Sequence, residues 1–498
     1  MEALDWLVIG VFFLALIGII VWVVRQKQND SADYFLGGRD ATWLAIGASI
    51  FASNIGSEHL IGLAGAGASS GMAMAHWEIQ GWMILILGWV FVPFYSRSMV
   101  YTMPEFLERR YNPQSRTILS VISLVSYVLT KVAVTVYAGG LVFQQVFGIK
   151  ELWGIDFFWI AAIGLVVLTA IYTIFGGMKS VLYTSVLQTP ILLLGSLIIL
   201  VLGFKELGGW DEMMRVCGAV TVNDYGDTMT NLIRSNDDAN FPWLGALIGS
   251  AIIGFWYWCT DQFIVQRVLS GKNEKEARRG TIFGAYLKLL PVFLFLIPGM
   301  IAFALHQKYI GAGGEGFLPM LANGTANADA AFPTLVAKLL PAGVKGLVVC
   351  GILAALMSSL ASLFNSSAML FTIDFYKRFR PETPEKKLVG IGQVATVVIV
   401  ILGILWIPIM RSVGDVLYTY LQDVQSVLAP GIAAAFLLGV CWKRTSAQGG
   451  MWGLISGMVI GLTRLGAKVY YSNAGEVADS TFKYLFYDMN WLVFCGWV

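Results

Sequence analysis

Charged residues are scarce in this chain. Asp, Glu, Lys and Arg make up 13% of its 498 residues, whereas a soluble domain carries roughly 25%. Hydrophobic residues make up 57%, and the mean hydropathy is +0.71. This composition excludes an ordinary soluble domain and predicts a polytopic membrane protein. No run of Lys and Arg is long enough to indicate nucleic-acid binding.

Cysteine pairs and soluble inserts are also lacking. The five cysteines are scattered, with no CxxC or metal-binding spacing, so we interpret them as packing residues rather than a disulfide or zinc framework. The apolar segments follow one another without a long soluble insert, which favours one membrane domain. The run at 4–24 is too long for a signal-peptide core and lacks a clear cleavage site, so it predicts a retained spanning helix.

What the chain has in abundance is apolar segments of spanning length. We expect about thirteen transmembrane helices, at 4–24, 43–70, 76–99, 117–147, 153–175, 183–203, 241–266, 280–305, 343–372, 388–410, 413–440, 447–465 and 484–498.

Lys and Arg gather in loops on one side of this arrangement, and the long loops at 204–240 and 306–342 lie on the other side. The positive-inside rule then predicts a multi-pass plasma (inner or cell) membrane protein with its N-terminus outside.

The stretch 51–62 is the most unusual part of the sequence. It places Asn54, Gly56, Glu58 and His59 in the middle of an apolar segment, where hydrocarbon offers no partner to a polar group. We expect the helix to break here at the membrane midplane. Its freed carbonyls would hold a cation, and its side chains a polar solute. The alternative is an unbroken helix packed by small residues, with Glu58 and His59 near a water-facing end.

A second interrupted segment suggests an internal repeat. The stretch 252–262 also combines a glycine, Gly254, with polar residues at mid-depth. Five helices at 43–203 and five at 241–440 then form two blocks of opposite orientation, each opening with an interrupted helix. This pattern is typical of secondary transporters. The segment 4–24 would be a peripheral helix, and 447–498 would add C-terminal helices.

Polar residues inside the apolar segments suit a neutral polyhydroxy solute, because they donate and accept hydrogen bonds to hydroxyls. Glu78 and Lys288 could pair, which lowers the cost of burying each. For any single residue the alternative is a structural hydrogen bond between helices. The set is Asn54, Glu58, His59, Glu78, Lys131, Tyr257, Asp261, Lys288 and Gln422.

Serines follow one face of the segment 343–372. Ser358, Ser362 and Ser366 recur every four residues. Such a face alone indicates close helix packing. Beside the carbonyls of a broken helix, however, two adjacent hydroxyls form an oxygen site of the kind that hard cations prefer, and sodium fits it.

Several motifs resemble the sodium/glucose cotransporters of the solute:sodium symporter family, in order over nearly the whole chain. They include Asn54-Ile55-Gly56-Ser57-Glu58-His59, Phe175-Gly176-Gly177, Trp256-Tyr257-Trp258-Cys259-Thr260-Asp261-Gln262, Tyr286-Leu287-Lys288, Ser358-Ser359-Leu360 and Tyr420-Leu421-Gln422. The resemblance implies an all-α, leucine-transporter-like fold of 5+5 inverted repeats with broken helices.

The resemblance also implies the sites. Sodium would be bound by the backbone carbonyls of Ala52, Ile55 and Ala355 and the hydroxyls of Ser358 and Ser359. The sugar would contact Asn54, His59, Glu78, Tyr257, Trp258, Lys288 and Gln422. Leu63, Trp77 and Tyr418 would form the outer gate, and Tyr257 the inner gate.

Some positions depart from the family's pattern. Gly81 and Gly254 replace polar sugar-contacting residues, which affects the hydroxyl preference. Ser185 stands where many relatives have the Asp of a second sodium site, and Ala361 replaces a hydroxyl residue. We therefore expect one sodium per sugar, unless Asp374 takes over that role.

Our main interpretation is a sodium-coupled symporter importing a neutral monosaccharide of the glucose or galactose type. The alternatives are a myo-inositol or other polyol symporter, and a sugar sensor or leak channel that does not couple transport. An intramembrane enzyme using Glu58 and His59 is not supported, because no nucleophile or metal-ligand cluster accompanies them. The expected partners are the sugar, sodium and membrane lipid, with no nucleic acid.

Overall fold

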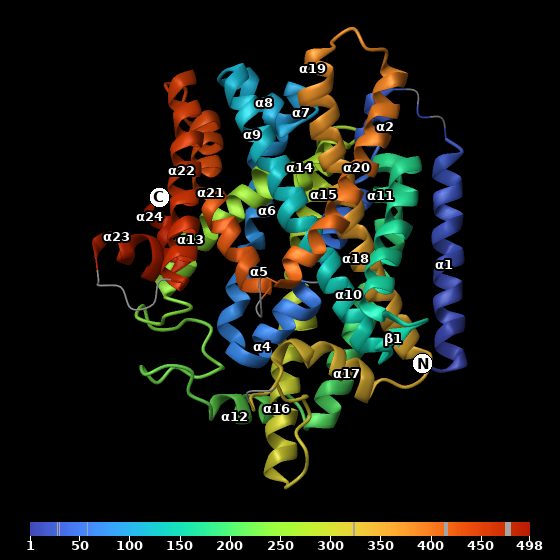
Figure 1. The fold of residues 1–498 in the computed structure, drawn as a ribbon, viewed down its shortest axis with the longest axis vertical. Helices are drawn as coiled ribbons and strands as arrows, with labels where there is room; N and C mark the ends of the chain where they lie inside the picture. The colour runs from blue at the N-terminus through green and yellow to red at the C-terminus, as the bar shows by residue number, and fades with distance from the viewer. Residues whose placement is uncertain (27, 29, 57, 322–323, 413–416, 474–479) are drawn as a thin grey trace.

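The structure is a computed structural model that describes residues 1–498 except 27, 29, 57, 322–323, 413–416 and 474–479. It does not describe the side chains of 129, 145, 409–412, 417–423 and 472–473. Within the described residues the chain is almost wholly helical (Figure 1). The strands β1 (Glu151–Leu152) and β2 (Ile155–Asp156) form a small antiparallel pair, with Glu151 opposite Asp156. By length and composition, nine helical stretches in the described part could span a bilayer.

One of these stretches is long enough for two crossings. Helix α11 (Phe157–Leu207) has 51 residues. At about 1.5 Å per residue such a helix is about 77 Å long, more than twice the roughly 30 Å hydrocarbon core. Gly177, with φ 52° and ψ −147°, interrupts its helical geometry. The segments expected at 153–175 and 183–203 therefore meet at a kink instead of being separated by a loop.

The two ends of the molecule differ in the loops they carry (Figure 1). Helices α12 (Trp210–Gly218), α16 (Ile297–Gly311) and α17 (Ala331–Leu339) lie at the same end as the N-terminus. Helix α8 (Met103–Arg110), which ends in Arg109 and Arg110, and the basic helix α19 (Lys377–Phe379) lie at the other end. This separation is the one that the charge pattern predicted; which end faces the cytoplasm stays a prediction.

The helix α1 (Ala3–Val24) runs along the outside of the bundle (Figure 1) and contacts α11 and α18 (Val344–Met369). Its Asp5 carboxylate accepts hydrogen bonds from the backbone N–H groups of Gly343 at 2.7 Å and Gly346 at 2.8 Å. A helix leaves its first N–H groups without intrahelical partners, so Asp5 of α1 caps the start of α18.

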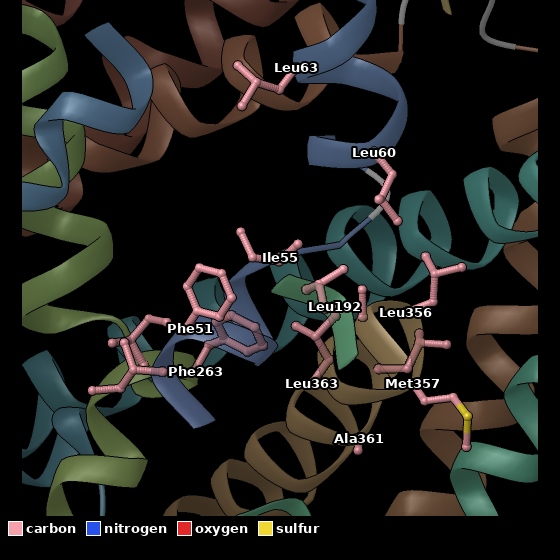
Figure 2. Close-up of a cluster of buried hydrophobic side chains, with 14 of the residues drawn as sticks. Phe51, Ile55, Leu60, Leu63, Leu192, Phe263, Leu356, Met357, Ala361 and Leu363 are labelled. Carbon is pink, nitrogen blue, oxygen red and sulfur yellow. The ribbon is translucent and has the colours of Figure 1, made fainter. Parts of the chain in front are cut away.

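The first predicted break is present. Helix α3 (Trp43–Asn54) ends at Ile55, whose ψ of 103° is extended. The chain resumes as a π-helix (Glu58–Leu63) and α4 (Ala64–Ser70). Figure 2 shows Ile55 at the end of α3 and Leu60 beyond the interruption.

The second break lies elsewhere than its glycine suggested. Gly254 is inside helix α13 (Trp243–Phe255), where a Cβ atom would lie 2.7 Å from Oε1 of Gln80. A π-helix (Trp256–Thr260) follows, and the interruption falls at Asp261, with ψ 127°. The Asp261 carboxylate then accepts the Phe263 N–H and caps α14 (Gln262–Leu269). Gly254 serves close packing, and Asp261 makes the break, which therefore falls inside the predicted stretch 252–262.

The core surrounds α18, because nearly every residue of this helix is buried. Helices α18 and α3 contact one another, and Leu363 of α18 lies near Phe51 and Ile55 of α3 (Figure 2). The first broken helix and the serine-bearing helix are therefore neighbours.

The remaining elements complete the bundle. They are α2 (Ser31–Leu36), α5 (His76–Ile79), α6 (Met83–Ile86), α7 (Val92–Ser98), α9 (Pro113–Ser126), the π-helix Tyr127–Val132, α10 (Ala133–Phe147), α15 (Glu274–Leu287), the π-helices Val292–Leu296 and Leu370–Tyr376, α20 (Glu385–Ser412), α21 (Leu417–Cys441), α22 (Ala447–Asn473), α23 (Thr481–Lys483), the π-helix Tyr484–Asp488 and α24 (Trp491–Trp497).

Helices α4 and α16 touch through their backbones. A Cβ atom on Gly299 would lie 1.9 Å from the carbonyl oxygen of Ala64. We expect Gly299→Ala to destabilise the protein by about 1–3 kcal/mol or more, because the backbones must separate. A thermal melt in detergent measures this effect. Gly164→Ala is the control, since nothing lies within 4 Å of its Cβ position, and equal melting temperatures of the two variants would contradict the expected backbone contact.

Candidate functional site

The hydroxyls of α18 face the end of α3. Ser359 Oγ donates a hydrogen bond to the carbonyl of Ser53 at 2.7 Å and approaches that of Ile55 at 3.5 Å. Ser358 Oγ lies 3.4 Å from Ser53 Oγ. The structure thus brings three predicted sodium ligands together: Ile55, Ser358 and Ser359. The other two, Ala52 and Ala355, are buried on the same two helices.

The carbonyl of Ser53 was missed by the sequence analysis. The last carbonyls of a helix have no intrahelical partner, so any residue in the final turn of α3 was a candidate acceptor. These carbonyls also form the negative end of the helix dipole. Neutral oxygens with that orientation fit a hard monovalent cation. Among the described residues no group of three or more His, Cys, Asp or Glu could hold another metal.

A network of serines continues from this position. Ser185 Oγ lies 3.2 Å from Ser358 Oγ and 3.4 Å from Ser49 Oγ. Arg267, which is 1% exposed, donates through Nε to Ser49 at 3.1 Å and Ser53 at 3.2 Å. Its Nη1 and Nη2 atoms have no hydrogen-bond partner among the described residues. Ser185, which the sequence analysis placed where relatives have the Asp of a second sodium site, is thus linked through Ser49 to the buried Arg267.

Asp374 is already engaged. Arg116 donates to its Oδ1 through Nε at 2.8 Å, Thr102 donates to the same oxygen at 2.8 Å, and Ser120 donates to Oδ2 at 3.1 Å. Since both oxygens accept hydrogen bonds, this carboxylate does not favour the role of a substitute sodium ligand.

A cavity of about 60 Å³ lies between the two broken helices. It unites six of the seven predicted solute contacts. Its lining residues are Asn54, Glu58, His59, Trp77, Glu78, Gln80, Ile253, Tyr257, Trp258, Lys288 and Gln425.

Two polar members of this lining, Gln80 and Gln425, were not predicted. Gln425 follows the predicted Gln422 by three residues on α21, and residues three apart share a helix face, so this spacing was the available clue. Gln422 and the outer-gate residue Tyr418 lie outside the described side chains.

Glu78 is held between two nitrogen groups. Its carboxylate oxygens lie 2.6 Å from Nζ of Lys288 and 3.2 Å from Nε2 of His59. Lys288 Nζ also lies 2.8 Å from that His59 nitrogen. Glu78 and Lys288 are each 3% exposed. A buried charge needs a partner, so the pairing expected from the sequence is present at the cavity wall.

The second broken helix supplies the aromatic side of the cavity. Asn54, the last residue of α3, donates to the hydroxyl of Tyr257 at 3.0 Å. Tyr257 meets Trp258 edge-on, with ring centroids 4.9 Å apart. The hydrogen bond between Asn54 and Tyr257 therefore joins the two broken helices directly.

The predicted outer gate is only partly assembled from the predicted residues. Trp77 lines the cavity and stacks on Trp491 of α24 at 4.7 Å. Leu63 is buried in the core and is not among the cavity's described lining residues. The contribution of α24 was missed, because a stack between segments more than 400 residues apart leaves no local pattern.

A second cavity, of about 40 Å³, connects the two sites. Ser359 of the sodium position and Tyr257 of the solute cavity both line it, together with Glu58 and Lys131. This cavity therefore has one wall at the cation position and another at the solute position.

Comparisons with known proteins agree with this arrangement. The sodium:solute symporter family matches residues 34–457. "Sodium/myo-inositol cotransporter 2" of Homo sapiens is 38% identical over 479 residues, which cover 93% of this chain and 70% of that protein. "Sodium/glucose cotransporter 2" of Rattus norvegicus is 38% identical over 512 residues, covering 98% of this chain and 75% of that protein.

Solved structures show the same fold. A Na⁺-coupled sialic acid symporter in a substrate-bound outward-open state gives a TM-score of 0.78 at 22% identity, covering 99% of this chain and 95% of that one. MhsT in complex with L-phenylalanine gives 0.55 at 11% identity, covering 85% and 98%. These likenesses confirm the leucine-transporter-like fold. With the family match over most of its length, this chain belongs to the sodium:solute symporter family and is a sodium-using membrane transporter, not an enzyme.

Proposed function

We propose that the protein imports a neutral monosaccharide or polyol together with sodium, by alternating access across the plasma membrane. The observation that carries this proposal is the cavity at which the two broken helices meet the Glu78, Lys288 and His59 cluster. Carboxylate, ammonium and amide groups there donate to and accept from hydroxyls, and Trp258 and Tyr257 offer apolar faces to a ring. The names of the two cotransporters described above support the same solute class.

Solute entry requires movement of the cavity walls. The cavity of about 60 Å³ is far below the roughly 300–1,000 Å³ of typical ligand pockets. Binding would therefore move Glu78 and Lys288 apart and replace their mutual contacts by contacts to hydroxyls. Trp77 and Tyr257 lie on the cavity wall, and we assign them to the outer and inner gates together with Leu63 and Tyr418.

Coupling follows from the break in α3. The Ser53 and Ile55 carbonyls face Ser359, and Asn54 between them reaches the solute cavity. A sodium ion bound by those carbonyls would fix the backbone that positions Asn54. Sodium binding then prepares the solute site without touching the solute.

The first test is an uptake panel in proteoliposomes. We expect concentrative uptake that needs an inward sodium gradient and is competed by glucose, galactose or myo-inositol. Replacement of sodium by potassium is the control. Equilibration without accumulation would support the sensor or leak-channel alternative, and competition by amino acids alone would contradict the solute class.

We further propose one sodium per solute, since Arg267 and Ser185 occupy the place of a second site. One ion contributes about 2.3 kcal/mol per 100 mV of membrane potential, in addition to its concentration gradient. The reversal potential of uptake at fixed gradients measures the ratio. A ratio of two ions per solute would overturn this proposal.

We also propose that the N-terminus faces the outside of the cell. Labelling of an N-terminal epitope on intact cells tests this orientation.

A further inference from the structure

A buried lysine lies at the second helix break and lines the second cavity, and it has no role in the transport proposed above. Lys131, in the π-helix Tyr127–Val132, is 9% exposed. Its Nζ lies 2.5 Å from Oδ2 of Asp261, the residue at which the second helix is interrupted. The hydroxyl of Tyr127 donates to Oδ1 of the same carboxylate.

The ammonium group is also surrounded by aromatic rings. Its nitrogen lies 4.9 Å from the centroid of Tyr127, 5.4 Å from Trp256, 4.8 Å from Tyr257 and 5.0 Å from Phe263. Ring faces within about 6 Å attract a cation, most strongly when water is excluded. A carboxylate together with four rings is an environment built for a positive charge.

The two breaks thus have matching roles in their repeats. At Ile55 the first helix opens toward neutral oxygens, which suit an ion from solution. At Asp261 the second helix opens toward a carboxylate, and that carboxylate already has a cation supplied by the chain. The nearby cavity of about 40 Å³ is lined by Lys131, Glu58 and Thr135, and the Thr135 hydroxyl donates to the backbone carbonyl of Lys131 at 2.8 Å.

We propose that Lys131 is a tethered cation that occupies a latent sodium site at the second break. With its side chain shortened, the Asp261 carboxylate, the Tyr127 hydroxyl and the oxygens of Glu58 and Thr135 present the hard ligand set that sodium prefers. The lysine thereby keeps the transporter at one sodium per solute. This inference rests on the proposed sodium-coupled transport.

The experiment compares Lys131→Thr with the unmodified protein in proteoliposomes. We expect the Hill coefficient for sodium to rise from near one to near two, and the reversal potential to report two sodium ions per solute. The double variant Lys131→Met with Asp261→Asn removes both charges and should stay near one. Lys131→Arg keeps the cation and should also stay near one.

A thermal measurement covers the case in which Lys131→Thr is inactive. A ligand that binds only the folded state stabilises it in proportion to the logarithm of its concentration. The melting temperature of Lys131→Thr in detergent should therefore rise about twice as steeply with log sodium as that of the unmodified protein. An equal slope, or active transport with one sodium per solute, would overturn the inference. If uptake by the unmodified protein does not depend on sodium, the proposed function itself is wrong.

Discussion

Glu78→Ala is expected to abolish solute uptake and to destabilise the protein by about 3–5 kcal/mol, because it leaves the charge of Lys288 buried without a partner. The two groups lie 2.6 Å apart, and each side chain is under 5% exposed. The same change removes a hydrogen-bond acceptor from the solute cavity. Uptake in proteoliposomes and a thermal melt measure the two effects separately.

Two controls separate burial from charge alone. Glu212→Ala breaks a pair of the same 2.6 Å length with Arg215, whose side chain is 71% exposed, so it should leave the melting temperature nearly unchanged. Glu78→Gln combined with Lys288→Met removes both buried charges, and should recover stability but not uptake. If the Glu78→Ala variant takes up solute as well as the unmodified protein does, the assignment of Glu78 to the solute site is wrong.

Ser359→Ala is expected to raise the sodium concentration needed for half-maximal uptake. The hydroxyl is lost from the position where the Ser53 and Ile55 carbonyls meet α18. Losing one polar contact to a bound group costs on the order of 1–3 kcal/mol, which is roughly a five- to hundred-fold change in the constant. Solute uptake at several sodium concentrations gives the value directly.

The matched control for Ser359 is Ser367→Ala, a serine on the same helix that is 0% exposed. Its removal should leave the sodium requirement unchanged, since Ser367 lies about two helical turns beyond Ser359 along α18. If the two variants show the same sodium requirement, the hydroxyl of Ser359 is not a sodium ligand.

The features that could be predicted from the sequence are those with a local cause. A Gly among polar residues in an apolar segment predicted the break after α3. The pairing of Glu78 with Lys288 could be predicted because buried charges need partners. The family's motifs then placed Asn54, His59, Tyr257 and Trp258 around the same cavity, as the structure has them.

The features that escaped prediction depend on distant segments. The Trp77 stack on Trp491, the carbonyl of Ser53 and the pairing of Lys131 with Asp261 each join parts of the chain that have no shared pattern. The second break falls inside the predicted stretch 252–262, and its exact place is Asp261, which caps the next helix with its own side chain. The local composition indicates that a helix is weak, but the residue that caps the next helix determines where the first one ends.

The cap that Asp5 provides has a consequence for how the protein is made. Its two backbone partners come 338 and 341 residues later. At about 5–20 residues per second of translation, α1 would wait roughly 17–70 s for α18 to emerge. Throughout that interval Asp5 has only its local partner, the N–H of Glu2, and the first helix is joined to the helix that bears Ser358 and Ser359 only after that helix has been made. A substitution that removes the Asp5 carboxylate would therefore affect assembly only after α18 has been synthesised.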